Sequence, residues 1–241
     1  MIHFLTQVAH WFTTAEHWRG VDGIPHRTLQ HVVMSGTAAA TAAAIALPVG
    51  IGLGHVGRGG VLAANLSNFG RAIPSFGLLV ILFQVYGITI WPTFIVLVLL
   101  AIPPILTNSY AGIRGVDPDM VDAARGMGMR GGQTLLRVEL PVAMPLVMAG
   151  VRTATVQVVA TAALGAVVAW GGLGRYVVDG IAAQDNVKVF SGALLVAFLS
   201  FGTEVGLAAV QRLVTPKPLR VGRISAKNEA FAGLAEAVDP A

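Results

Sequence analysis

Long stretches without any charged side chain constrain this chain more than any other feature. No Asp, Glu, Lys or Arg occurs between residues 72 and 113. A bilayer has a hydrocarbon core about 30 Å thick, so a crossing helix needs roughly 20 apolar residues. The stretch has room for two crossings, and the whole chain is 55% hydrophobic and only 12% charged. A soluble protein with fully buried helices fits such recurring runs poorly. The sequence therefore predicts an all-α integral membrane protein.

The apolar segments predict about five transmembrane helices. They cover roughly residues 30–54, 61–86, 89–113, 141–169 and 188–212. The chain contains 29 glycines, and small residues allow helices in a membrane to pack closely. Prolines at positions 48, 74, 103 and 104 allow kinks where neighbouring groups satisfy the freed carbonyls.

Composition divides the chain into three parts, residues 1–28, 29–214 and 215–241. The first part is polar and aromatic by turns, and Trp11 and Trp18 are expected on one apolar helix face. Such a face is typical of a helix lying in the membrane interface, and a solvated leader is the alternative. The middle part holds the predicted spans. The last part is Pro-broken and basic at first, and we expect it to be a disordered cytoplasmic tail.

Basic residues indicate how the chain is oriented, because short cytoplasmic loops carry an excess of Lys and Arg. One set of loops holds Arg58, Arg114, Arg125, Arg130, Arg137, Arg212, Lys217, Arg220, Arg223 and Lys227. The other set holds Arg19, Arg27, Arg175 and Lys188. We therefore expect the N-terminus outside and the C-terminus in the cytoplasm.

A charged, glycine-rich loop interrupts the apolar chain at residues 114–140. Asp117 is suited to capping a helix that starts at Pro118, and Gly128 can take the left-handed conformation that ends one. A second helical turn leads to Leu140–Pro141, where the chain returns to the membrane. Ala123 and Ala124 leave little bulk beside Asp122, so another surface could approach the backbone closely. A docking surface and an ordinary capped loop both fit these residues.

This loop resembles the cytoplasmic signature of the inner-membrane subunits of bacterial ABC importers. That signature reads EAA, three residues, Gly, nine residues, Ile, any residue, Leu-Pro. The chain keeps the spacing throughout, with Asp in place of the Glu and Val in place of the Ile. The residues that the resemblance assigns to ATPase coupling are Asp122, Ala123, Ala124, Gly128, Val138, Leu140 and Pro141.

Residues 29–217 more broadly resemble permeases of osmoprotectant importers, which serve glycine betaine, choline, carnitine and proline. The stretches RAIPSFGLLVILF (71–83), ELPVAMPLVMAGVRTATVQ (139–157) and GGLGRYVVDGI (171–181) carry this resemblance. It implies the transmembrane subunit of a type I ABC importer, with a cytoplasmic coupling helix around Asp122. Such a subunit is multi-pass in a bacterial inner membrane and catalyses no reaction.

The same resemblance implies partners and cofactors. Two ATPase subunits would hold ATP and Mg²⁺, so no cofactor is expected on this chain. A second permease copy or a sister permease, an extracytoplasmic substrate-binding protein and the lipid bilayer complete the expected partners. No nucleic acid, metal site or catalytic residue is expected. The chain also lacks the GxxxxGK[ST] loop that would cradle phosphates.

Polar residues within the predicted spans are candidates for the transport pathway or gate. Arg152 stands near mid-membrane, and pairing with Glu204 is favoured over a contact with substrate because an unpaired charge is costly there. The full set of candidates is Arg71, Pro74, Asn108, Arg152, Gln157 and Glu204. Alternative functions are the permease of another ABC branch, such as one for methionine, a secondary carrier with inverted repeats and acidic sites, or a non-transport scaffold.

Overall fold

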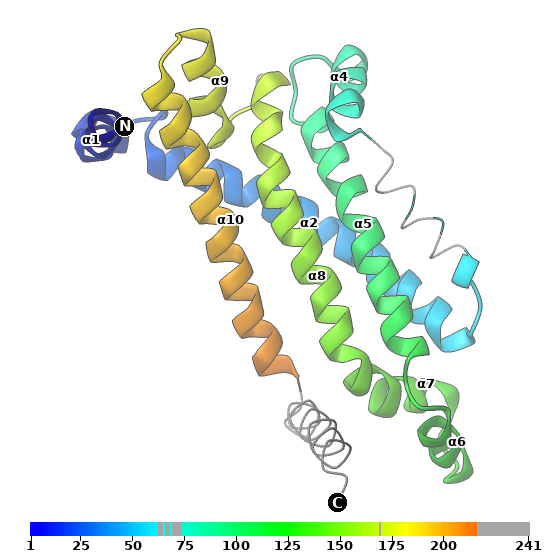
Figure 1. Ribbon diagram of the computed structural model, residues 1–241. Helices are drawn as coiled ribbons and strands as arrows, with labels where there is room; N and C mark the ends of the chain where they lie inside the picture. Colours follow the sequence, from blue (N-terminus) through cyan, green and yellow to red (C-terminus); the bar gives the residue numbers. More distant parts are fainter. Residues whose placement is uncertain (62–64, 66–67, 69–73, 169, 216–241) are drawn as a thin grey trace, which may run out of the picture.

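In the computed structural model, the described part of the chain contains four helices long and apolar enough to cross a membrane (Figure 1). They are α2 (Ile24–Val56), α5 (Trp91–Arg114), α8 (Leu140–Ala162) and α10 (Asn186–Val214). The structure describes residues 1–61, 65, 68, 74–168 and 170–215. The all-helical expectation is confirmed for these residues.

The second predicted span, 61–86, corresponds only in part to a described helix. Helix α4 (Ser75–Tyr86) is apolar but has 12 residues, too few to cross a bilayer on its own. Most of the residues that precede it, Arg71 among them, lie outside the described part. So does the tail beyond residue 215 that we expected to be disordered.

Short helices occupy the two ends of the bundle. One end, which we call the α6 end, carries α6 (Pro118–Gly126) and α7 (Gly131–Thr134), followed by a π-helical turn η2 (Leu135–Glu139). The opposite end, the α9 end, carries α1 (Ile2–Thr13), α9 (Gly174–Ala182) and the 3₁₀ turns η1 (Ala15–Trp18) and η3 (Ala163–Val168). Helices α2, α5 and α10 all finish at the α6 end, where α8 begins (Figure 1).

Helices α2, α5 and α8 form the core because small residues bring them close together. Ala38, Ala42 and Ala46 repeat every four residues along α2, so they share one face, and each is fully buried. They pack against a buried set from the other two helices. That set comprises Leu97, Val98, Ala101, Ile105 and Leu106 of α5 and Ala154, Val158 and Ala162 of α8.

Two glycines show how close these helices approach. A Cβ added at Gly50 of α2 would lie 2.7 Å from the carbonyl oxygen of Leu106 on α5. One added at Gly150 of α8 would lie 2.6 Å from Cβ of Asn108, also on α5. Both contacts are shorter than any side chain tolerates, so the three helices pack through backbone as much as through side chains.

Helix α10 stands apart from this core. It packs on α8 and α9, whereas none of its most apolar segment is buried within the chain. Its outer surface carries the exposed side chains Phe198, Phe201, Val205 and Leu213. Because a face this apolar is unsuited to water, α10 must be covered by lipid or by another protein.

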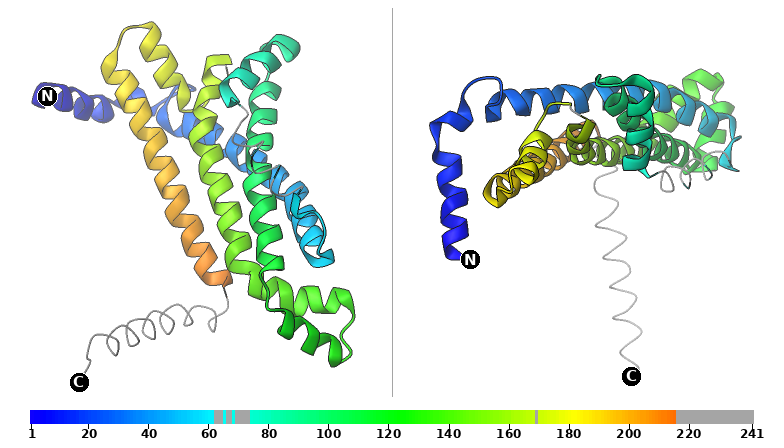
Figure 2. Two further views of the ribbon diagram at one scale, coloured as in Figure 1. Left: turned by 45° about the vertical axis from the view of Figure 1, so that its right-hand side comes forward. Right: turned by 90° about the horizontal axis from the view of Figure 1, so that it is seen from above.

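Helix α1 runs across the α9 end of the bundle rather than along it (Figures 1 and 2). It packs on α10 through an edge-on contact between Phe4 and Phe190. The expectation that Trp11 and Trp18 share one interfacial helix face is wrong. Trp11 is buried against Tyr176, whereas Trp18 is half exposed and lies in the separate turn η1. The helix ends at Thr13, where the Thr13 and Thr14 hydroxyls both donate to the carbonyl of His10.

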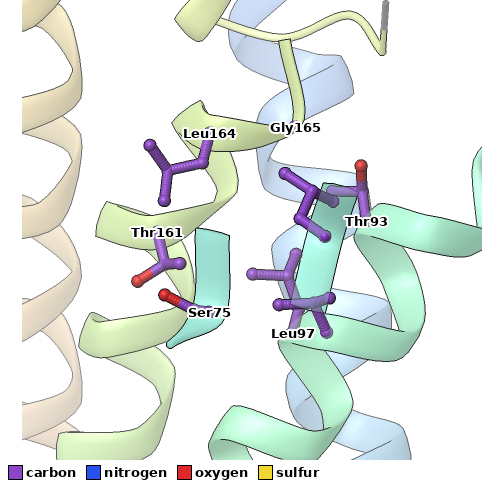
Figure 3. Close-up of a pocket in the computed structure, with 8 residues that line it drawn as sticks. Ser75, Thr93, Leu97, Thr161, Leu164 and Gly165 are labelled. Atoms are coloured by element: carbon purple, nitrogen blue, oxygen red, sulfur yellow. The ribbon is translucent and has the colours of Figure 1, made fainter. Parts of the chain in front are cut away.

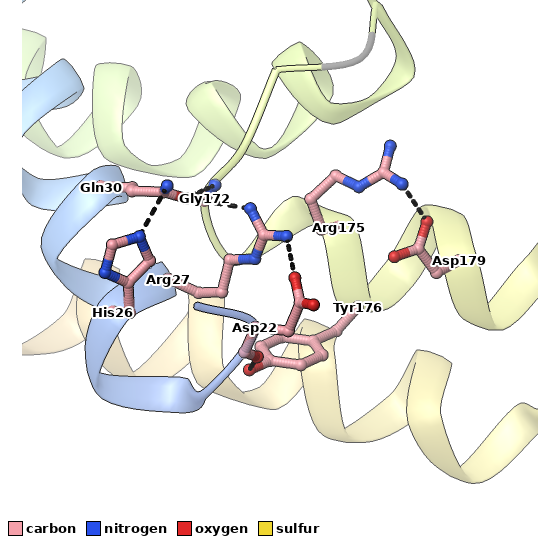
Figure 4. Close-up of polar contacts among 8 residues, drawn as sticks. All are labelled: Asp22, His26, Arg27, Gln30, Gly172, Arg175, Tyr176 and Asp179. Carbon is pink, nitrogen blue, oxygen red and sulfur yellow. Dashed lines mark hydrogen bonds and ion pairs between the residues drawn. The ribbon is translucent and has the colours of Figure 1, made fainter. Parts of the chain in front are cut away.

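A polar network braces the α9 end (Figure 4). The side-chain oxygen of Gln30 on α2 accepts hydrogen bonds from the Gly172 amide and from Arg27, each at 3.0 Å. Arg27 also pairs with Asp22, and the Tyr176 hydroxyl donates to the Asp22 carbonyl at 2.5 Å. Burial raises the pKa of Tyr176 to about 12, so the hydroxyl remains a donor at physiological pH. These bonds fix the start of α2 to α9.

Substitution of Gly150 tests the close contact between α5 and α8. We expect Gly150→Ala to destabilise the protein by about 1–3 kcal/mol, because the new methyl group overlaps Asn108 and the Pro104 carbonyl. Gly36→Ala is the matched control: no atom lies within 4 Å of its added Cβ, and Ala favours helix, so stability should hold or rise. Thermal unfolding of the detergent-solubilised protein measures both variants. Equal midpoints would contradict this packing.

Candidate functional site

Helix α6 begins with a satisfied cap. The Asp117 carboxylate accepts a hydrogen bond from the Asp119 amide at 2.9 Å, and Pro118 occupies the first turn. The acidic side chain of Asp119 lies at the positive end of the helix dipole. The predicted helix start is confirmed.

The end of α6 depends on Gly128. Its φ of +83° lies in the left-handed region, which a side chain disfavours. The Met129 amide donates to the Ala124 carbonyl at 3.2 Å and the Gly128 amide to the Arg125 carbonyl at 2.9 Å. These two bonds are those of a Schellman motif, which stops a helix and reverses the chain. The predicted glycine corner is confirmed.

The chain then returns to the membrane through a wide turn. The Arg130 amide donates to the Gln133 side chain at 2.9 Å at the start of α7. The π-helical turn η2 follows and continues directly into α8. Because a π turn holds an extra residue, it rotates the side chains that precede α8, and it buries Glu139 to 4% exposure.

The inner side of α6 is fixed to the membrane bundle. Val121 packs on a buried cluster at the ends of α5 and α8. That cluster comprises Ile113, Val116, Ala143 and Val147, with Leu135 and Leu140 against it. Helix α6 is therefore an attached extension of α5 and α8, and movement imposed on it would reach both.

The outer side of α6 opens on an apolar groove. Met120 and Met127 are 46% and 75% exposed there, although both are large and apolar. The groove runs between α6 and the start of α8, and it is lined by Met120, Ala123, Ala124, Met127, Arg137, Val138, Pro141 and Val142. Four of the residues expected in coupling, namely Ala123, Ala124, Val138 and Pro141, thus meet on one surface.

The other expected coupling residues lie elsewhere. Gly128 forms the corner, and Leu140 packs into the buried cluster rather than facing the groove. Asp122 lines a separate polar cavity on another side of α6. Its carboxylate stands 3.8 Å from Arg125, and both side chains are more than half exposed, so this pair contributes little to stability.

A histidine–carboxylate pair in the polar cavity was not anticipated from the sequence. His55, in the last turn of α2, donates from Nδ1 to the buried Glu139 carboxylate at 2.6 Å. Glu139 occupies the unspecified position of the signature, between Val138 and Leu140. The available signal was an acidic residue directly before one span and a histidine at the end of another, on the same side of the membrane. This pair therefore links the last turn of α2 to the residue that directly precedes α8.

The six pathway candidates do not form one cluster. Arg71 lies outside the described residues. Asn108 donates to the Pro104 carbonyl at 2.7 Å within α5, and Gln157 is exposed, about 140° around α8 from Arg152. Arg152 and Glu204 lie together: Nε of Arg152 is 3.3 Å from Oε1 of Glu204, which confirms the expected pairing.

Pro74 stands directly before α4, at its N-cap position. The next residue, Ser75, lines a small cavity at the α9 end (Figure 3). The cavity is lined by the hydroxyl residues Ser75, Thr93 and Thr161, together with apolar neighbours. The Thr93 hydroxyl is buried and lacks a hydrogen-bond partner among the described residues. The cavity has room for about one water molecule and is too small for a transported solute. No three His, Asp or Glu side chains that could hold a metal gather in the described part of the chain.

Comparison with known families and structures extends this picture. The family model described as "Binding-protein-dependent transport system inner membrane component" matches residues 44–216. Among solved structures, an inward-facing form of the MetNI methionine ABC transporter is similar, with a TM-score of 0.66 and 22% identity. The match covers 80% of this chain and 96% of that one. At this identity the likeness concerns the fold alone.

Several curated proteins match over most of their length. The glycine betaine/carnitine/choline transport system permease protein OpuCB of Bacillus subtilis is 31% identical, over 81% of this chain and 90% of that protein. The carnitine transport permease protein OpuCB of Listeria monocytogenes is 32% identical, over 82% and 90%. The osmoprotectant import permease protein OsmW of Salmonella typhimurium is 31% identical, over 80% and 92%.

The His55–Glu139 pair can be tested through stability. His55→Leu leaves a buried carboxylate without its partner, so we expect a loss of about 1–3 kcal/mol. The double variant His55→Leu/Glu139→Leu removes both polar groups and should recover part of that loss. Thermal unfolding in detergent measures both. Strictly additive effects of the single variants His55→Leu and Glu139→Leu would argue against a coupled pair.

Proposed function

The chain belongs to the binding-protein-dependent transport system inner-membrane components and is a permease subunit of an ABC importer, and we propose that it takes up osmoprotectants. Glycine betaine, carnitine and choline are the substrates named for its relatives, and proline is a further candidate of the same class. The observation that carries the proposal is identity of 30–32% with permeases of this class over about four-fifths of the chain. The subunit itself catalyses no reaction.

The α6–α7 loop is proposed to be the part that engages the ATPase. An exposed apolar groove beside two methionines supports this role, because methionine adapts to the surface of a partner. The packing of Val121 against the buried cluster of α5 and α8 supports it further. Closure of an ATP-bound dimer of ATPase subunits would push α6, and the attached helices would alternate the pore between its two openings.

The remaining arrangement follows from this role. The α6 end would face the cytoplasm, which agrees with the arginines at positions 58, 114, 125, 130, 137 and 212 near it. The N-terminus would then lie outside the cytoplasm, with α1 in the interface on the extracytoplasmic side of the inner membrane. Residues 29–214 would form the transport domain, with the segment that includes α4 as a fifth crossing. A second permease, two ATPase subunits carrying ATP and Mg²⁺, and a substrate-binding protein would complete the importer.

Uptake by a reconstituted importer tests the proposed function. Proteoliposomes that contain the permease, its ATPase and its binding protein should accumulate at least one of glycine betaine, carnitine, choline and proline. Uptake should stop when ATP hydrolysis is blocked by mutation of the ATPase, and it should persist when an ionophore collapses ion gradients. Uptake that needs a gradient and not the ATPase would indicate a secondary carrier. Methionine uptake alone would assign the chain to another branch.

The glycine corner provides a test of coupling. Val at position 128 would force a β-branched residue into the left-handed region, so we expect Gly128→Val to abolish substrate-stimulated ATP hydrolysis while the protein still inserts into the membrane. Gly128→Asn should retain part of the activity, because Asn tolerates this conformation. Gly126→Ala is the control, since Gly126 has neither positive φ nor any atom within 4 Å of an added Cβ. Normal stimulation in the Gly128→Val complex would contradict the coupling role.

A further inference from the structure

The Arg152–Glu204 ion pair lies deep in the predicted membrane region. Arg152 stands about 18 Å along α8 from its start, and Glu204 about 15 Å from the end of α10. Both distances fall near the middle of a hydrocarbon core about 30 Å thick. The two helices are held together below the pair by the Gln211 side chain, which donates to the Pro145 carbonyl at 2.8 Å.

The pair is open to its surroundings. The Arg152 and Glu204 side chains are 30% and 42% exposed. Charged groups at this depth do not face lipid, because hydrocarbon offers no hydrogen bonds and water is absent. The pair must therefore face a water-filled path or a partner subunit. The neighbouring side of α10 carries apolar residues suited to lipid.

Most of the bonding capacity of the pair is unused. Nε of Arg152 stands 3.3 Å from one carboxylate oxygen of Glu204. The described residues supply no other hydrogen bond to either side chain. Nearby hydroxyls are already committed, since Ser200, Thr203 and Thr155 each donate to a carbonyl of their own helix. The Arg152 guanidinium has further donors, and its planar fork can bind a carboxylate through two hydrogen bonds.

We propose that Arg152 and Glu204 form a transient binding site for a zwitterionic solute that carries a carboxylate and a quaternary ammonium. The inference rests on the proposed function, and it names the site at which such a solute passes through the subunit. The carboxylate of the solute binds the Arg152 guanidinium while its cationic head lies against Glu204. The ion pair opens to admit the solute and closes after it leaves, so neither charge is left unpaired in the membrane.

The surface around Glu204 suits a quaternary ammonium. Phe201 lies one helical turn before Glu204, at the edge of the apolar outer face of α10, and is 69% exposed, so its ring can reach a cationic group bound at Glu204.

Comparing zwitterions with a simple cation tests the site. Glycine betaine and carnitine carry a carboxylate, whereas choline has the same cationic head without one. In the assembled complex of permease and ATPase, without the binding protein, we expect Arg152→Gln to weaken binding of glycine betaine and carnitine at least about tenfold. Choline binding should be unchanged or stronger.

Two further variants extend this comparison. Arg152→Lys should restore part of the affinity for the zwitterions, and Glu204→Gln should weaken binding of all three solutes. Equilibrium dialysis with labelled solutes measures each affinity.

The outcomes separate a binding site from a structural ion pair. A merely structural pair would change the affinities of all three solutes by the same factor in Arg152→Gln, and that result would overturn the proposal. Unchanged affinities in both variants would also overturn it. Failure of the proposed function would look different, because the unmodified complex with its binding protein would then take up none of the osmoprotectants.

Discussion

Close contact among α2, α5 and α8 is the constraint on which the rest of this structure depends. Buried alanines along α2 and glycines such as Gly150 allow backbone to approach backbone, where larger side chains would hold the helices apart. In a membrane this packing cannot draw on the hydrophobic effect between helices, so small residues and van der Waals contact supply it. The result is a firm three-helix unit. Helix α6 is attached to this unit through Val121, and the His55–Glu139 pair adds α2 to the same connection.

Helix α10 is less embedded in the bundle than the three core helices. It touches α8 and α9, its outer face is open, and its one ionic contact with α8 is the half-exposed Arg152–Glu204 pair. A firm unit beside a less embedded helix would suit the proposed alternating access, because a push on α6 would move the unit as one body relative to α10. The opposite end is braced by the bonds of Gln30 and Tyr176, which keep α9 fixed to the start of α2.

Local chemistry made much of this arrangement predictable. The uncharged runs identify the long helices, because a segment that crosses the hydrocarbon core must be a helix of roughly 20 apolar residues. The caps of α6 follow from Asp117, Pro118 and Gly128, since each residue type suits one position of a helix terminus. Pairing of Arg152 with Glu204 follows from the cost of isolated charge. These expectations concern residues whose own chemistry decides their conformation or partner.

Contacts between distant segments were harder to predict. Trp11 was expected in the interface, yet it is buried, because the tertiary contact with Tyr176 outweighs the preference of the isolated helix. The contact between Glu139 and His55 was not predicted, because no local sequence pattern marks the π turn that rotates Glu139 toward His55. The division of the coupling residues between groove, corner and buried cluster likewise depends on how α6 lies against α8.

Cross-linking at α6 tests the central claim most directly, namely that the outer groove of α6 is the surface which docks on the ATPase. The chain contains no cysteine, so a single one can be placed at will. A photo-activated maleimide cross-linker on Ala123→Cys, in the groove, should capture the ATPase subunit in the assembled complex, and capture should change with ATP. The same label on Ile181→Cys of α9, at the opposite end, should capture none. Capture of the ATPase from position 181 and not from position 123 would contradict both the docking surface and the orientation of the chain.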